Sequence, residues 1–132
     1  MSIPLVCIGL LATLVIALAF IIFIVRFKKG VMYGYTINPE DTLYKAVRAH
    51  GNATEYVPII ALLIYILGSM PLSSWVLWCM ILITLFRYMA AAGILFPKTM
   101  TKPNPLRLIG TLGTYVTGFG LCAALLIKAL NI

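Results

Sequence analysis

Four long apolar runs with very few charges constrain this sequence more than any other feature. They cover approximately residues 3–25, 48–67, 75–96 and 106–127. A helix needs about 20 apolar residues to cross the roughly 30 Å hydrocarbon core of a bilayer, and each run reaches that length. Only 10% of the residues are charged, against about 25% in soluble domains. The sequence therefore predicts an all-α integral membrane protein, a four-transmembrane-helix bundle that forms a single domain over residues 1–132.

The first run resembles a signal peptide only in its hydropathy. Residues 1–6 carry no basic side chain, and the small residues Ala17 and Ala19 lie inside the run rather than at its end. A secretory signal has a positive start and a small-residue cleavage site after the apolar stretch. We therefore expect this run to be retained as a membrane span.

The second helix is expected to start before its apolar run. Asn38 suits an N-cap, Pro39 suits the first helical position, and the acids Glu40 and Asp41 suit the positive end of the helix dipole. A helix from there to Leu67 would be about 42 Å long. Its first turns should therefore protrude from the bilayer.

The cations are distributed unevenly along the chain, whose net charge is +7. Those expected on one side of the membrane, or at its boundary, are Arg26, Lys28, Lys29, Lys45, Arg48, Lys98, Lys102 and Arg107. Only Lys128 is expected on the other side. The positive-inside rule places the larger group in the cytoplasm and both termini outside. For Arg26, Lys28 and Lys29, a role confined to topology and anionic lipid headgroups stays open.

Two charges lie inside the expected spans and need an explanation. Glu55 is one to two turns inside the second span, and Arg87 is about 14 Å from the cytoplasmic end of the third. A charge near the bilayer centre costs at least about 2.5 kcal/mol, so such residues usually face a bundle interior or an aqueous cavity. Their similar depth predicts that Glu55 and Arg87 are partners, either in an ion pair that fixes helix packing or in a binding site.

The second helix also carries a polar stripe. At about 100° per residue, Lys45, Arg48, Asn52 and Glu55 fall within an arc of roughly 80°, and Tyr56 flanks this arc. Cations, an amide and a carboxylate thus line one face that runs into the membrane.

Arg26 and Arg107 can join this stripe from the ends of the first and fourth spans. Arginines would bind carboxylates through bidentate hydrogen bonds, while Glu55 would bind an ammonium group and Asn52 a peptide group. Because cations outnumber acids in this set, the preferred ligand is a small anion that also carries a positive group.

The remaining patterns indicate packing or exclude functions. Gly110, Thr114, Gly118 and Cys122 form a stripe of small residues that favours close helix packing. The cysteines lie in apolar runs without metal-binding spacing, so no metal site is predicted. The residue sets for phosphate loops and nucleic-acid recognition are absent. The first span also lacks the acid that a small four-span drug exporter would need.

The polar stripe lies within a recognisable motif. Residues 47–58, VRAHGNATEYVP, resemble the R-A-[HQ]-x-N-x-x-E-[YF]-x-P signature of the MAPEG family, the membrane-associated proteins in eicosanoid and glutathione metabolism. Similarity at residues 25–29, 86–87 and 105–107 extends the resemblance over nearly the whole chain. The chain lacks the longer loops of some eukaryotic members and looks like a short prokaryotic one.

The resemblance implies a homotrimer of four-helix protomers that binds glutathione, as a co-substrate, between adjacent subunits at a site open to the cytoplasm. It implies glutathione transfer to hydrophobic small-molecule electrophiles, or reduction of lipid hydroperoxides, among the membrane lipids of a bacterial inner membrane. Arg107 matches the arginine proposed to stabilise the glutathione thiolate. The residues implied to bind glutathione are Arg26, Arg48, Asn52, Glu55, Tyr56 and Arg87.

The sequence also departs from the family pattern. If Arg87 is aligned with the family arginine of the third helix, Ala90 and Ile94 stand where members often carry His or Tyr that line the glutathione pocket. The connection from Pro97 to Asn104 is longer than usual. Two functions are therefore weighed: a glutathione-dependent membrane transferase or peroxidase, and a non-catalytic lipid- or glutathione-binding scaffold of the same family.

Overall fold

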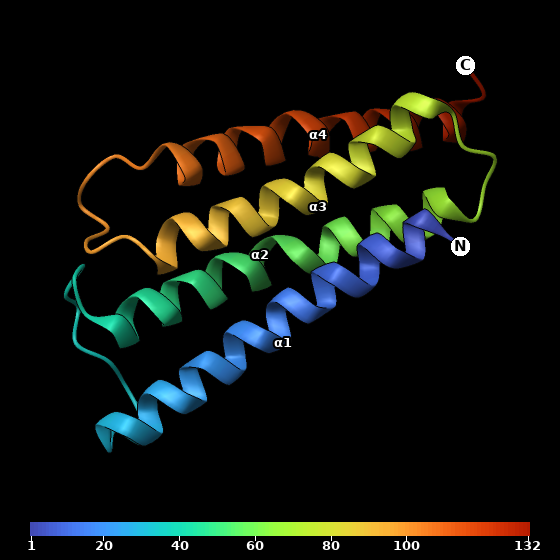
Figure 1. Ribbon diagram of the computed structural model, residues 1–132. Coiled ribbons are helices and arrows are strands. Elements are labelled where there is room, and N and C mark those ends of the chain that lie inside the picture. Colours follow the sequence, from blue (N-terminus) through green and yellow to red (C-terminus); the bar gives the residue numbers. More distant parts are fainter.

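The computed structural model describes all residues from 1 to 132 and consists of four helices. These are α1 (Ile3–Lys29), α2 (Thr42–Gly68), α3 (Ser74–Leu95) and α4 (Pro105–Leu130). Each is long and apolar enough to cross a membrane. Both termini and the α2–α3 connection lie at one end of the bundle, and the α1–α2 and α3–α4 connections lie at the other (Figure 1). This is the all-helical, four-span architecture that the apolar runs predict.

Helix α1 continues four residues past the end of its expected span. Ser2 caps its start, because the Ser2 hydroxyl accepts a hydrogen bond from the Leu5 amide. The helix ends at Gly30, which adopts a left-handed conformation (φ 66°) that terminates helices readily. Three basic residues lie in the last turn, where they interact favourably with the negative end of the helix dipole.

The expected start of α2 is wrong by a few residues. Asp41 is the N-cap and accepts a hydrogen bond from the Tyr44 amide at 3.0 Å, so the helix begins at Thr42. The Asn38 side chain instead accepts from the Glu40 amide, which makes a local turn that contains Pro39. Asp41 also pairs with Lys29 at the end of α1, and this contact fixes it at the cap position.

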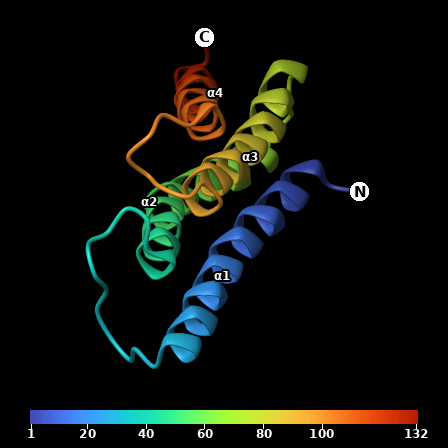
Figure 2. The ribbon, with the colours of Figure 1, turned by 60° about the vertical axis from the view of Figure 1, so that its left-hand side comes forward.

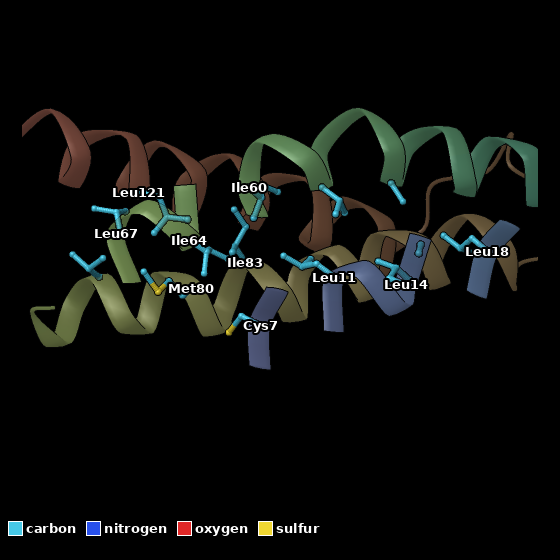
Figure 3. Close-up of a cluster of buried hydrophobic side chains, with 14 of the residues drawn as sticks. Cys7, Leu11, Leu14, Leu18, Ile60, Ile64, Leu67, Met80, Ile83 and Leu121 are labelled. Atoms are coloured by element: carbon cyan, nitrogen blue, oxygen red, sulfur yellow. The ribbon is translucent and has the colours of Figure 1, made fainter. Parts of the chain in front are cut away.

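The core is shared by all four helices. Leu11 of α1, Ile64 of α2, Met80 of α3 and Leu121 of α4 are fully buried at the centre of one apolar cluster (Figure 3). Helix α1 packs on α2 and α3 and does not contact α4, which lies on the other side of the bundle (Figure 2). Helix α4 packs mainly on α3 and meets α2 over a smaller area.

Glycines allow α3 and α4 to approach closely. A Cβ atom on Gly110 would lie 2.5 Å from the Ala90 backbone nitrogen, and one on Gly113 would lie 2.5 Å from the Phe86 ring. The predicted packing role is therefore confirmed at Gly110, with α3 as the contacted helix. Further along the same stripe Cys122 is exposed, although α4 still packs on α3 at Gly120, where a Cβ atom would lie 2.9 Å from Cys79 Sγ.

Candidate functional site

Arg87 lies at the centre of a buried polar cluster between α2, α3 and α4. Only 1% of its surface is exposed. One guanidinium nitrogen, Nη2, donates to Asn52 Oδ1, and Nη1 donates to Thr114 Oγ1 at 3.3 Å. The guanidinium carbon lies 4.4 Å from the centroid of the Tyr56 ring, within the range of a cation–π contact. An amide, a hydroxyl and an aromatic face therefore surround this charge.

The expected ion pair between Glu55 and Arg87 is wrong, while their joint role in a binding site stays a prediction. Glu55 is exposed on α2 and makes no ion pair, since the ion pair of the structure joins Lys29 and Asp41. Asn52 and Tyr56 are four residues apart and share the helix face that meets α3, whereas Glu55 leaves the helix on a neighbouring face. Arg87 thus has no carboxylate partner within the protomer, and its Nε has no hydrogen-bond partner at all.

Tyr115 extends the cluster towards the surface. The hydroxyl oxygens of Tyr56 and Tyr115 are 3.0 Å apart, and the two rings are tilted against each other. Sequence reasoning gave Tyr115 no role and gave its neighbour Thr114 only a packing role. The sequence feature that could have indicated this role is the phenol of Tyr115 beside the hydroxyl of Thr114 in an otherwise apolar span. This feature is not specific, because a tyrosine in a membrane helix has many structural uses.

An open groove of about 260 Å³ lies beside this cluster, between α2 and α4. Its polar wall is formed by Glu55, Tyr56, Thr114 and Tyr115. The rest of the wall is mostly apolar, with Ile59, Leu63 and Phe119 among its side chains. The groove therefore places a carboxylate and two phenols next to a surface that suits a hydrophobic guest.

The three other arginines expected in the site lie apart from the cluster. Arg26 donates to the Gly34 carbonyl at 2.7 Å, and half-buried Arg107 donates to the Met100 carbonyl at 3.2 Å. Arg48 is exposed, with its guanidinium close to Gly51 of its own helix. One protomer thus brings together Asn52, Tyr56 and Arg87 and leaves Arg26, Arg48 and Arg107 outside.

Lys45 does not belong to the exposed polar stripe. Only 8% of its surface is exposed, and its Nζ donates to the Pro97 carbonyl at 2.8 Å. Helical periodicity predicts the direction in which the Lys45 side chain leaves the α2 axis. It does not predict that the α3–α4 connection covers this side chain. The stripe that remains accessible on α2 begins at Arg48.

A family model matches most of the chain. The match covers residues 4–127 and is described as the MAPEG family. The chain belongs to the MAPEG family. No curated protein and no solved structure matches it. Family membership and the four spanning helices together establish an integral membrane protein and associate it with glutathione-related transferase and peroxidase functions.

The cations of this MAPEG protein gather at one end of the bundle, as predicted. The helix termini at that end are the C-termini of α1 and α3 and the N-termini of α2 and α4 (Figure 1). At the other end, Lys128 donates to the Pro71 carbonyl at 2.6 Å. At the charged end, the hydrogen bond from Lys29 lowers the pKa of Asp41 below its usual value.

Proposed function

We propose that this MAPEG protein is a glutathione-dependent membrane transferase or peroxidase that acts on hydrophobic electrophiles or lipid hydroperoxides. The observation that carries the proposal is the α2–α4 groove, where Glu55 and Tyr56 border an apolar surface and the Arg87 cluster lies directly behind. Such a groove offers polar groups for a charged peptide and apolar contacts for a lipid-like acceptor.

The polar groups have the chemistry that glutathione requires. Asn52 accepts from Arg87 through its carbonyl oxygen, so both amide hydrogens remain free for a peptide carbonyl. Exposed Glu55 can bind the glutathione ammonium group, and exposed Arg48 can bind a carboxylate in a bidentate manner. Arg87 holds Asn52 and the Tyr56 ring in place and adds a positive potential to this wall.

Arg26 can take part only if a second copy supplies it. Within one protomer the Arg26 guanidinium donates to the Gly34 carbonyl, and Arg26 does not line the α2–α4 groove. We therefore place the site between subunits of a homotrimer, with Arg26 contributed by the neighbouring α1. The large apolar side chains exposed on α1, such as Phe20 and Phe23, are available for that contact and for membrane lipids.

Arg107 is the residue that would stabilise the reacting thiolate. A free thiol has a pKa of about 8.5 and is only a few per cent ionised at pH 7. A guanidinium that lowered the thiol pKa by two units would contribute about 2.7 kcal/mol. Arg107 uses one side-chain donor on the Met100 carbonyl, and the other N–H groups of its guanidinium remain available.

The two reactions share the attacking thiolate and differ in the acceptor. With an aryl halide, the thiolate sulfur bonds to carbon and the halide leaves with the electron pair of its bond. With a hydroperoxide, the sulfur attacks the terminal oxygen, the alcohol leaves, and a second glutathione reduces the sulfenic acid to the disulfide and water.

The charged end of the bundle would face the cytoplasm, the source of glutathione, with both termini outside, as in a bacterial inner membrane.

A non-catalytic lipid- or glutathione-binding scaffold is the second candidate, and two buried residues favour it. Ala90 lies beneath Gly110, and Ile94 belongs to the apolar core. Neither position offers a polar side chain to a ligand. A scaffold of this kind needs the groove but not Arg107.

The test uses purified protein in detergent, glutathione and a nitro-activated aryl chloride. We expect conjugation above the uncatalysed rate and a rise in unfolding temperature with glutathione, because a ligand that binds only the folded state stabilises it. A temperature shift without conjugation would favour the scaffold. Absence of both effects would refute glutathione binding and the proposed enzyme together.

A further inference from the structure

The guanidinium of Arg107 is held by the connection between α3 and α4. Its Nη1 donates to the Met100 carbonyl, and the Met100 amide donates to the Pro39 carbonyl at 3.1 Å. Met100 therefore bridges the start of α4 and the segment that leads into α2. The direction of the Arg107 side chain depends on where this connection lies.

Lys45 holds the same connection three residues earlier. Its Nζ donates to the Pro97 carbonyl, and its side chain is buried beneath the connection. Lysine is rarely buried unless its ammonium group is bound, because an unpaired buried charge is costly. Two contacts thus tie the connection to the α2 side of the bundle, one from Lys45 and one from Pro39.

The backbone at Arg107 is fixed independently of these contacts. A Cβ atom on Gly93 would lie 2.4 Å from the Arg107 backbone nitrogen, and the Asn104 side chain accepts from the Arg107 amide at 3.1 Å. The start of α4 is therefore pressed against α3 and capped. What the connection determines is the position of the guanidinium rather than that of the helix.

We propose that Lys45 is a positioning residue for Arg107, acting through the α3–α4 connection. The inference rests on the proposed function, in which Arg107 stabilises the glutathione thiolate. Lys45 does not touch the substrate, since its side chain is buried and its donor faces Pro97. It keeps the backbone of residues 97–100 in the place where the Met100 carbonyl meets the Arg107 guanidinium.

The test compares Lys45→Met with Lys45→Arg and with Lys102→Met. Methionine keeps an unbranched apolar side chain and removes the donor, whereas arginine restores a donor. Lys102 is exposed on the same connection and makes no hydrogen bond or ion pair, so Lys102→Met is the matched control. If Lys45→Met does not fold, Lys45→Leu, which also lacks a donor, replaces it with the same expected outcomes.

We expect Lys45→Met to lower kcat at pH 7 by about threefold to tenfold, the range for one lost hydrogen bond, with little change in KM for glutathione. The acidic limb of the kcat profile should move to higher pH, because a poorly placed Arg107 lowers the thiol pKa less. Hydrogen exchange at the Met100 amide should become faster. Lys45→Arg should recover most of each effect, and Lys102→Met should behave as the wild type.

Three results would overturn the inference: an unchanged pH profile and kcat in folded Lys45→Met, an unchanged exchange rate at Met100, or no recovery in Lys45→Arg. A wild-type protein that neither binds nor conjugates glutathione would refute the proposed function itself. In that case exchange at Met100 alone decides whether Lys45 holds the connection, and an unchanged rate refutes it.

Discussion

The guanidinium of Arg87 on α3 lies against the ring of Tyr56 on α2, 4.4 Å from its centroid, and no carboxylate of the chain pairs with it. Asn52 and Thr114 complete the surroundings of this charge. A planar cation can stack on a ring and direct its N–H groups to separate oxygens, which a lysine cannot do. The site therefore depends on arginine at this position, not merely on a positive charge.

Replacement of this arginine should show that dependence. We expect Arg87→Lys to lower the free energy of unfolding by about 1 to 3 kcal/mol, because it loses the ring contact and at least one hydrogen bond. Thermal unfolding in detergent measures this. Arg48→Lys on exposed α2 surface is the control and should change stability by less than about 0.5 kcal/mol. Equal unfolding temperatures for the two variants would contradict a structural role for the Arg87 geometry.

Close packing of α3 on α4 gives a second prediction. Gly110→Ala places a Cβ atom 2.5 Å from the Ala90 backbone nitrogen, so the helices must separate at a cost of about 1 to 3 kcal/mol. Gly9→Ala on α1 meets nothing within 4 Å and should be neutral or stabilising by up to about 1 kcal/mol. Gly110→Ala should therefore lower the unfolding temperature of the protein. Gly9→Ala should leave the unfolding temperature unchanged or raise it. Matching losses in the two variants would show that α4 is not seated on α3 in this way.

The pair formed by Asp41 and Lys29 predicts a pH dependence. The Lys29 hydrogen bond lowers the folded-state pKa of Asp41, so the stabilisation is present above the unfolded pKa of about 3.9 and is lost as pH falls through the lower folded value. Because the pair is partly exposed to solvent, the effect should be below about 1 kcal/mol. Asp41→Asn keeps an N-capping side chain but should remove the pH-dependent stabilisation that comes from the pair of Asp41 with Lys29.

The measurement is the unfolding temperature between neutral pH and about pH 3. The difference between wild type and Asp41→Asn should shrink as pH falls. Glu40→Gln removes a neighbouring exposed acid that makes no ion pair and serves as the control. A difference that stays constant over the whole range would mean that the Lys29 contact does not hold the Asp41 carboxylate.

Arg107 separates the enzyme from the scaffold. We expect Arg107→Ala to lower kcat by about 25-fold at pH 7, because a thiol whose pKa rises from about 6.5 to about 8.5 changes from mostly ionised to a few per cent ionised, while the glutathione-induced temperature shift persists. Arg48→Ala should instead weaken the shift more than kcat, because Arg48 is expected to bind a carboxylate in both ground state and transition state. Loss of binding and turnover to the same extent in Arg107→Ala would argue against a thiolate role.

Local sequence signals predicted the helices well and the site only in part. Apolar run lengths fixed the four spans, and the basic residues marked one end of the bundle. The start of α2 was missed because Asn38 and Asp41 are both good caps, and the choice between them depends on Lys29, which comes from another helix.

The missed contacts of the site have the same origin. Depth alone suggested Glu55 as the partner of Arg87, but the rotation of α2 against α3 presents Asn52 and Tyr56 instead. Tyr115 and the buried Lys45 could be assigned only once α4 and the α3–α4 connection were in place. Periodicity gives the face of a helix, whereas partners depend on how helices pack.

The most direct test is an experimental structure of the protein in lipid with glutathione bound. We expect density for the tripeptide in the α2–α4 groove, beside Asn52 and Glu55 of one subunit and Arg26 of the next, with the thiol facing Arg107. A groove filled by side chains of a neighbouring copy, with no tripeptide at saturating glutathione, would contradict a glutathione site and leave only a membrane scaffold.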